Sequence, residues 1–219
     1  ACYYLGQEAK SSIGLVASAL EKKSVEFSEV YRLGRTCMQD AQPMTLGQAF
    51  AGYHAVIDRA ASRVGDQQQR LLTIPLGGTA IGTGLGSAPG FQKAVFKHLR
   101  EISGLPVVPV KNRFDGMQNL DEFQRLSAEL ETATGAMAKI AKDFILLSSG
   151  PAGGLAEISL PSVQPGSSIM PGKVNPVIAM STIQLAQIVH GNHCCIVMAC
   201  QDGMLEINHY EHSVASRLW

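Results

Sequence analysis

The chain has 219 residues, of which 46% are hydrophobic and 16% are charged, and its formal net charge is zero. This length allows one or two domains with a sizeable core. The neutral charge balance argues against nucleic acid or an anionic membrane surface as the partner. No apolar run reaches the roughly eighteen residues that a membrane span needs, and ACYYLGQEAK at the start has neither the basic beginning nor the apolar core of a signal peptide.

The cysteines indicate a reducing compartment. Their number is odd and two are adjacent, which makes a poor disulfide framework and suits free thiols. The five are Cys2, Cys37, Cys194, Cys195 and Cys200. We therefore expect a cytoplasmic protein that binds neither membrane nor nucleic acid.

Apolar residues at helical spacing predict helices along the first part of the chain. The first covers residues 8–30, and Gly34 ends it. A second begins near Pro43, a residue that suits a helix N-terminus, runs to about Val64 and continues as polar helix over 66–72. The glycine-rich stretch GGTAIGTGLGSAPG that follows predicts a loop.

The second half of the chain also reads as helices separated by loops. A helix is expected over Phe91–Ser103, and the longest candidate, 118–147, contains no proline. The irregular run from SSGPAGG to SSIMPG follows, and helix returns from Val177 to about Cys200. Because no run of strands and no alternating βαβ pattern is found, the predicted class is all-α, a bundle of long helices.

Two of these helices are apolar around much of their circumference, a pattern typical of helices buried on all sides. The few helices of one chain cannot bury them. We therefore expect helices from other subunits to complete the bundle.

The segment PGSSIMPGKVNP, Pro165–Pro176, concentrates polar side chains where neither helix nor strand can form. Long irregular loops are often functional, and the two glycines would permit a hinge. Lys173 can hold a carboxylate and Asn175 can add an amide donor. Ser167 and Ser168 can accept a proton if the alkoxide is stabilised. The set suits proton abstraction from a small dicarboxylate; a merely flexible linker is the alternative.

The motif GSSIMPGKVNP resembles the signature of the aspartase/fumarase superfamily, also called the fumarate lyase family. Three further stretches resemble that family: GRTCMQDAQPMTLGQAF (34–50), GGTAIGTGLG (77–86) and LLSSGPAGGLAEISLP (146–161). The likeness extends over nearly the whole chain. LLSSGP, NPVI and GMLEIN resemble the aspartase branch more than the class II fumarases.

The resemblance implies a homotetramer with one central helical bundle and with three chains contributing to each active site. It also implies elimination of ammonia, water or a larger amine from a succinyl skeleton to give fumarate, without metal or organic cofactor. The leading hypothesis is an ammonia-lyase acting on L-aspartate. A fumarase is the alternative within the family, and a non-catalytic helical scaffold that kept the fold is the alternative outside it.

The resemblance also implies roles for individual residues. Ser167 matches the general base, and loop amides with Lys173 would stabilise its alkoxide. Ser168 is interpreted as a hydrogen-bonding residue of the substrate loop rather than a second base.

Other positions match groups that contact the substrate. Lys173 and Asn175 match positions that bind a substrate carboxylate, Thr36 matches a hydroxyl that contacts the substrate, and Gln39 is a polar neighbour in that motif. Without its flanking motif, Thr36 would be interpreted as an ordinary helix cap.

Two positions depart from the family pattern. Cys37 stands where the family commonly has histidine, and Met180 stands where it usually has glutamate. In the family, the carboxylate orients and charges the imidazole. Here both are replaced by side chains that can pack together, which is compatible with an active lyase that lacks the pair or with weak or altered activity. A nucleophilic Cys37 is disfavoured because no adjacent histidine provides a base.

Family chains are longer than this one, so residues 1–219 are expected to be the central helical-bundle domain, without the family's N-terminal and C-terminal domains. The 77–86 loop is not interpreted as a P-loop because it has no Gly-Lys-Ser/Thr ending and follows no predicted strand. Zinc is conceivable but not expected at the histidine and cysteine cluster, whose spacing matches no standard pair of ligand knuckles. Its members are His190, His193, Cys194, Cys195, His209 and His212.

Overall fold

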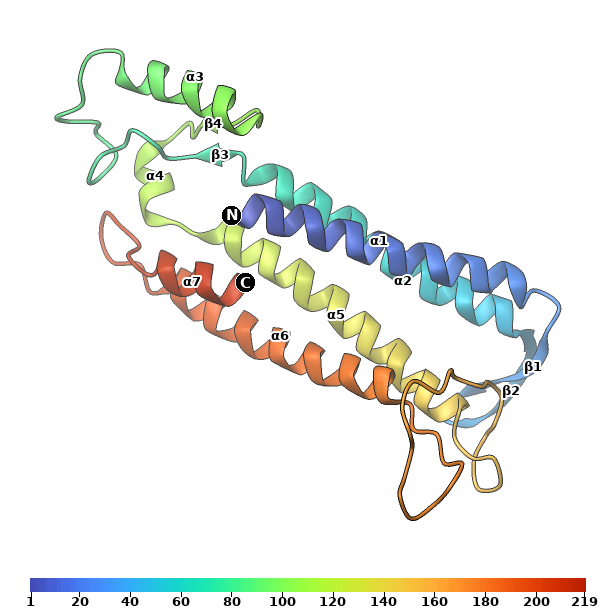
Figure 1. The fold of residues 1–219 in the computed structure, drawn as a ribbon. Coiled ribbons are helices and arrows are strands. Elements are labelled where there is room, and N and C mark those ends of the chain that lie inside the picture. The colour runs from blue at the N-terminus through green and yellow to red at the C-terminus, as the bar shows by residue number, and fades with distance from the viewer. The chain divides into compact units, whose positions relative to one another are not determined.

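The computed structural model describes all 219 residues, which form two compact units. Unit 1 comprises Ala1–Gly14, Arg59–Leu130 and Gly191–Trp219, and unit 2 comprises Leu15–Asp58 and Glu131–His190. Four long helices contribute a segment to each unit (Figure 1). They are α1 (Cys2–Glu26), α2 (Leu46–Arg70), α5 (Asp121–Leu147) and α6 (Val177–Gln201). The all-α class predicted from the sequence is confirmed.

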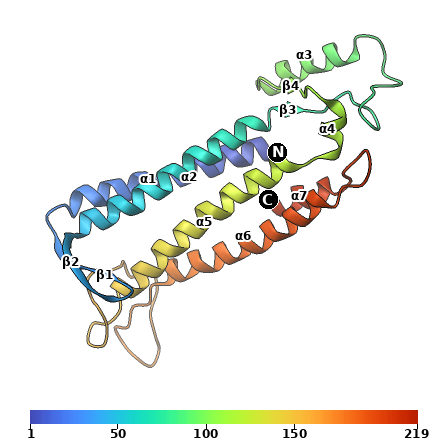
Figure 2. The ribbon, with the colours of Figure 1, turned by 180° about the vertical axis from the view of Figure 1, so that it is seen from behind.

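The prediction for the chain after the first helix is wrong in detail. The helix, expected over 8–30, ends at Glu26, and a β-hairpin lies between α1 and α2 (Figure 2). Strand β1 (Tyr31–Thr36) pairs antiparallel with β2 (Gln39–Thr45). Pro43, expected near a helix N-terminus, lies inside β2 opposite Leu33.

Helix α2 begins at Leu46 because Thr45 and Gln48 form a reciprocal cap. The backbone N–H of Gln48 donates to Oγ1 of Thr45 at 3.1 Å, and the backbone N–H of Thr45 donates to Oε1 of Gln48 at 2.9 Å. This is a capping box, which satisfies two otherwise unpaired donors of the first turn. The helix then continues without a break to Arg70, as expected for the polar continuation predicted over 66–72.

Unit 1 contains the remaining short elements. A two-residue strand β3 (Thr73–Ile74) pairs in parallel with β4 (Val108–Pro109), so the glycine-rich loop does follow a strand, contrary to the sequence analysis. Helix α3 (Phe91–Ser103) has the predicted bounds, whereas α4 (Arg113–Gln118) and α7 (Glu211–Leu218) were not predicted as separate helices.

Two apolar clusters form the core of unit 1. One lies between the N-terminal part of α5, the C-terminal part of α6 and α7; its buried members are Leu120, Ile196, Ala199, Val214 and Leu218. The other lies where α3 packs against the β3–β4 region, with Leu72, Phe96 and Val107 buried. None of the helices in the chain could span a membrane.

Aromatic rings form part of the core of unit 2. Phe50 on α2 contacts Phe27 at 5.4 Å, Tyr53 at 5.7 Å and Phe144 at 5.6 Å between ring centroids. Edge-to-face and offset pairs of this kind add to the stabilisation from burial alone. They join the end of α1, the start of α2 and the end of α5, which is the part of the unit that carries the candidate site.

The part of α6 in unit 2 presents an exposed apolar face. Ile178, Leu185 and Ile188 are 66%, 61% and 60% exposed. These side chains belong to one of the helices predicted to be buried on all sides, and within this chain that burial is not achieved.

Candidate active site

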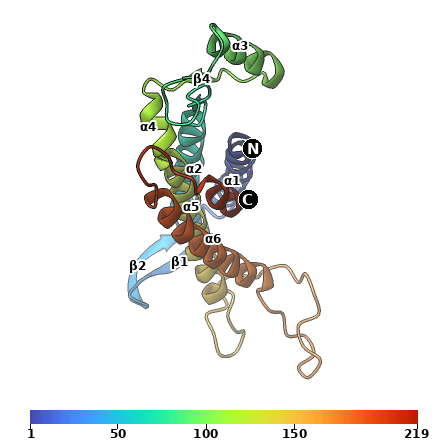
Figure 3. The same ribbon diagram turned by 90° about the vertical axis from the view of Figure 1, so that its left-hand side faces the viewer.

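Residues 148–176 connect α5 to α6 without helix or strand and project from the helical segments of unit 2 (Figure 3). The first part of this connection folds back against the end of α5. The N–H of Glu157 donates to the carbonyl oxygen of Leu147 at 2.8 Å, and the N–H of Ala156 donates to that of Ser149 at 2.8 Å. The loop entry is therefore fastened to the last turn of α5.

The segment Gly166–Asn175, which we name the substrate loop, is closed at its base. The side-chain Nδ2 of Asn175 donates to the carbonyl oxygen of Gly166 at 3.0 Å. A Cβ atom at Gly166 would overlap the carbonyl oxygen of Lys173, so only glycine fits there without a shift of the backbone. The second N–H of the Asn175 amide is left for another acceptor.

Ser167 lies inside the substrate loop and receives two backbone donors. Its Oγ accepts hydrogen bonds from the N–H of Ile169 at 3.2 Å and of Met170 at 3.1 Å. Donors aimed at an oxygen favour its negatively charged form. Ser168, by contrast, is exposed.

Lys173 and Asn175 line a cavity of about 790 Å³, together with the end of α5 and the loop entry. Lys173 is exposed and forms no ion pair within the chain, and Glu157 is the one acidic residue of the lining. Ser167 does not line this cavity. The substrate loop thus places the Lys173 ammonium and the Asn175 amide at the cavity, whereas Ser167, with its two amide donors, lies outside it.

Thr36 and Gln39 face each other across the tip of the β-hairpin. The two residues between them, Cys37 and Met38, have φ values of 51° and 64°, which is the backbone of a type I′ turn. Thr36 is therefore a strand residue, and the helix-cap interpretation is wrong. Thr36 and Gln39 are exposed, and no hydrogen bond joins either to the substrate loop of the same chain.

The two departures from the family pattern are also exposed. Cys37 lies at the hairpin tip and Met180, 47% exposed, lies in the first turns of α6. Within this chain, the side chains of Cys37 and Met180 therefore do not bury each other.

A charged cluster that sequence reasoning missed joins the hairpin to the loop entry. Arg32 and Arg35 of β1 both pair with the carboxylate of Glu157, at 3.0 Å and 2.5 Å. The only signal was the position of Glu157 within LLSSGPAGGLAEISLP, and nothing in the sequence named its partners.

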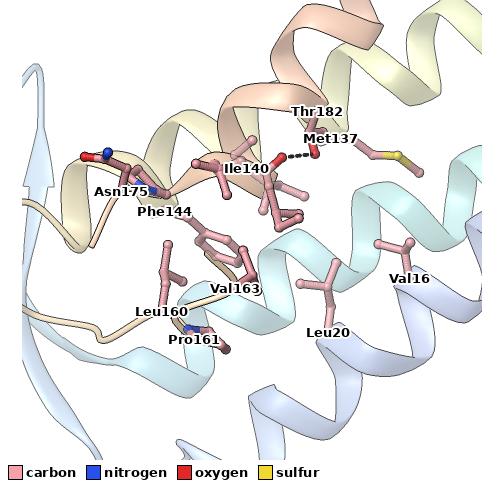
Figure 4. A pocket seen from close by; sticks show the side chains of 15 residues that line it. Val16, Leu20, Met137, Ile140, Phe144, Leu160, Pro161, Val163, Asn175 and Thr182 are labelled. Carbon is pink, nitrogen blue, oxygen red and sulfur yellow. Dashed lines mark hydrogen bonds between the residues drawn. The ribbon is translucent and has the colours of Figure 1, made fainter. Parts of the chain in front are cut away.

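A second cavity, of about 420 Å³, is unsuited to a charged substrate (Figure 4). It is lined mainly by aliphatic side chains and Phe144. Its polar side chains are Asn175 and Thr182, and the Thr182 hydroxyl donates to the carbonyl oxygen of Ile178 at 2.9 Å. Burying a dicarboxylate there would leave its charges unpaired.

Two histidines of α6 lie next to side chains of α5. In unit 2, Nδ1 of His190 lies 3.0 Å from Oε1 of Glu131. In unit 1, Nδ1 of His193 lies 3.0 Å from the hydroxyl of Ser127. Nowhere in the 219 residues do three or more histidine, cysteine or acidic side chains form a group that could hold a metal ion.

Comparisons with known proteins agree over most of the chain. A family model described as "Lyase" matches residues 9–191. The chain is 48% identical over 191 residues to aspartate ammonia-lyase of Bacillus subtilis (strain 168), covering 87% of this chain and 40% of that protein. It is 40% identical over 207 residues to the class II fumarate hydratase of Neisseria meningitidis, covering 94% and 45%.

Solved structures give the same result for the fold. A fumarate lyase:delta crystallin from Brucella melitensis, bound to cobalt, superimposes with a TM-score of 0.92 and 37% identity, covering 99% of this chain and 46% of that chain. A class II fumarase from Schistosoma mansoni superimposes with a TM-score of 0.90 and 36% identity, covering 96% and 47%. The chain spans less than half the length of these relatives.

Proposed function

This chain belongs to the aspartase/fumarase (fumarate lyase) superfamily, and from that premise we propose that the intact protein eliminates ammonia from L-aspartate to give fumarate. Several of the relatives are aspartate ammonia-lyases, and fumarate hydratases are similar at comparable identity. The lyase class follows from the family; the amine as leaving group is the finer part of the proposal.

The observation that carries the mechanism is the pair of backbone amides at Ser167 Oγ. Serine is a poor base unless its alkoxide is stabilised, and two fixed N–H donors do this without reorganisation. The Ser167 alkoxide would take a proton from the carbon beside one substrate carboxylate, leaving an aci-carboxylate. The electron pair then forms the carbon–carbon double bond as the bond to the amine breaks.

We assign substrate binding to groups on both segments. Lys173 would hold a carboxylate as a point charge, and the free N–H of Asn175 would orient it. Thr36 and Gln39 would contact the substrate from the hairpin tip, and Ser168 would add a hydrogen bond from the loop.

We further propose a homotetramer with active sites shared between subunits. Two features support it: the hairpin tip and the substrate loop make no hydrogen bond to each other within one chain, and α6 exposes apolar side chains along unit 2. Such a face costs free energy in water and is normally covered by a partner. None of the five cysteines forms a disulfide, which suits the cytoplasm as the location. No cofactor is assigned to this chemistry.

The test is fumarate formation by the intact protein, followed by ultraviolet absorbance, with L-aspartate and L-malate offered separately. We expect fumarate from aspartate and none above background from malate. Ser167→Ala should abolish turnover, whereas Ser162→Ala, an exposed serine of the same 148–176 connection, should retain it. Fumarate from malate alone would identify a fumarase instead.

A catalytically impaired scaffold is the second candidate, and the replacements at Cys37 and Met180 favour it. In that case neither substrate gives fumarate, and Ser167→Ala does not differ from the parent. Combining Cys37→His with Met180→Glu would then be the variant to assay, because it restores the family's pair of side chains.

A further inference from the structure

Glu157 lies between the two segments to which substrate contacts are assigned. Its Oε1 is 2.5 Å from Nη1 of Arg35, and its Oε2 is 3.0 Å from Nη2 of Arg32. The side chains of Arg32, Arg35 and Glu157 are 13%, 22% and 20% exposed, so water screens these charges only weakly. One carboxylate therefore holds two guanidinium groups of the same strand.

The hairpin is shaped so that both arginines reach the same side. Residues three apart on a regular strand point to opposite faces. Here the β1–β2 register shifts between Leu33 and Arg35. At the shift, a Cβ on Gly34 would lie 2.9 Å from the carbonyl oxygen of Gln42 and 3.2 Å from Sδ of Met44. The irregularity thus depends on a glycine and aligns Arg32 with Arg35.

The backbone of Glu157 is equally constrained. Its N–H donates to the carbonyl oxygen of Leu147 at the end of α5, and the preceding Ala156 has a φ of 50°. Glu157 is also one of the residues that line the 790 Å³ cavity, together with Lys173 and Asn175. A single residue thus connects the end of α5, the entry to the 148–176 connection and the strand that ends in Thr36.

Stability alone does not account for this arrangement. Arg35 Nη1 and Glu157 Oε2 are buried atoms that make no hydrogen bond, so the contacts are ion pairs without aligned hydrogen-bond geometry. Partly buried ion pairs of this kind recover little more than their desolvation cost, and their best-attested benefit is to fix one arrangement among several.

We propose that Glu157 is a positioning residue of the lyase reaction, which holds the Thr36 hairpin and the entry to the Ser167 loop on one frame through Arg32 and Arg35. The inference rests on the proposed function. Arg35 directly precedes Thr36, so loss of the Glu157 charge frees the hairpin tip and the loop entry together. This holds whether the two segments serve the same active site or sites in neighbouring subunits.

The first readout does not depend on activity. Glu157→Gln keeps the size of the side chain and removes its charge; Glu101→Gln, on an exposed ion-paired glutamate of α3, is the matched control. We expect Glu157→Gln to speed backbone hydrogen exchange in 31–45 and in 155–176 and to leave α3 unchanged. The control should leave both segments at the parent rate. Unchanged exchange in both segments with Glu157→Gln would overturn the positioning role.

The second readout is the rate of fumarate formation from L-aspartate. A misplaced catalytic segment costs about 10- to 100-fold in kcat, so Glu157→Gln should lose that much and Glu157→Asp, which keeps the charge, should recover part of it. A parental kcat in Glu157→Gln would overturn the proposal, even with faster exchange. If the parent forms no fumarate, the proposed function fails, and the exchange data still decide whether Glu157 positions the two segments.

A third variant covers failure of Glu157→Gln to fold. Arg35→Lys keeps the positive charge and removes the planar fork that matches a carboxylate. It should produce the same paired increase in exchange at 31–45 and 155–176. An increase confined to the hairpin would show that Arg35 does not act on the loop entry.

Discussion

The phenolic oxygen of Tyr53 on α2 donates a hydrogen bond of 2.7 Å to Oδ2 of Asp143 on α5. Lys139 pairs with the same carboxylate and its Nζ lies 5.2 Å from the centroid of the Tyr53 ring. Tyr53 also belongs to the aromatic cluster of unit 2. Asp143 therefore has two partners, and Tyr53 is held both by a hydrogen bond and by aromatic packing.

Replacing Tyr53 by phenylalanine isolates the polar part of this interaction. The ring remains, and the hydrogen bond to Asp143 is lost, so we expect the free energy of unfolding to fall by about 1 to 2 kcal/mol. Urea titration of the variant and the parent measures this difference.

The matched control is Tyr31→Phe, since the Tyr31 side chain is 77% exposed and makes no hydrogen bond. Its free energy of unfolding should change by no more than about 0.5 kcal/mol. Equal losses in the two variants would contradict the assignment.

The Tyr53 hydroxyl should also make the free energy of unfolding depend on pH in the alkaline range. Burial raises the pKa of Tyr53, and the hydrogen bond to Asp143 and the charge of that carboxylate raise the pKa further, against a smaller opposing effect of Arg32. The folded state therefore holds this proton more tightly than the unfolded state. The contribution of this proton to stability is complete below the usual tyrosine pKa of about 10. It is lost as the pH rises from there towards the higher pKa of the folded state.

Unfolding free energies measured from about pH 8.5 to 11.5 check this sign. Stability of the parent should fall more steeply over that interval than stability of Tyr53→Phe. Parallel curves would mean that the Tyr53 phenol titrates alike in the folded and unfolded chains.

Gly166 provides a prediction about the substrate loop. An alanine there would place its Cβ against the carbonyl oxygen of Lys173, so the base of the loop must open. We expect Gly166→Ala to lower kcat/KM for L-aspartate by about 100-fold, as for other small displacements of reacting groups. The loop contributes little core, so thermal unfolding should stay close to that of the parent.

Gly153 is the control, because it lies in the same 148–176 connection and a Cβ there meets nothing within 4 Å. Gly153→Ala should keep parental kcat/KM. Similar activity in both alanine variants would mean that the base of the loop tolerates being opened.

Asn208 provides a prediction about unit 1. It is 4% exposed; its Nδ2 donates to the carbonyl oxygens of Ala199 and Cys200 at 3.0 and 3.2 Å, and its Oδ1 accepts from the N–H of Tyr210 at 2.9 Å. Asn208→Ala would leave these groups unpaired and should cost about 2 to 3 kcal/mol. Asn192→Ala, inside α6, should cost nothing by comparison because alanine favours helix. Chemical denaturation of both variants distinguishes the two cases.

The helices were predictable because their apolar residues recur at helical spacing over long windows. The last helix was expected from Val177 to about Cys200 and is observed over Val177–Gln201. The longest one was expected over 118–147 and is observed over Asp121–Leu147. Over such lengths the burial of one face determines the structure, and local propensity matters little.

The hairpin was missed because it lacks the usual signals. Its two-residue turn places Cys37 and Met38 at positive φ, where Asn-Gly or Asp-Gly would be expected. Its strands are short and mostly exposed, so they show no apolar alternation. Pro43, interpreted as a helix start, lies in a strand, a position it tolerates in a two-stranded edge.

The substrate-loop residues were identified from the resemblance, and their local geometry was not. The two amides at Ser167 depend on how the backbone folds around Gly166 and Lys173, which no spacing rule describes. The pairing of Glu157 with Arg32 and Arg35 joins positions far apart in the chain. Such long-range pairs follow from the folded arrangement, since any of the 18 lysines and arginines was an equal candidate beforehand.

The closed base of the substrate loop has a mechanical consequence. Because the Asn175 amide joins the two ends of the segment, Gly166–Asn175 forms a compact unit with its own internal hydrogen bonds. Ser167 and both of its amide donors belong to this unit, so the stabilisation of the proposed base needs no contact from outside the loop. Substitutions at the base of the loop should therefore change the position of Ser167 without removing its two amide donors.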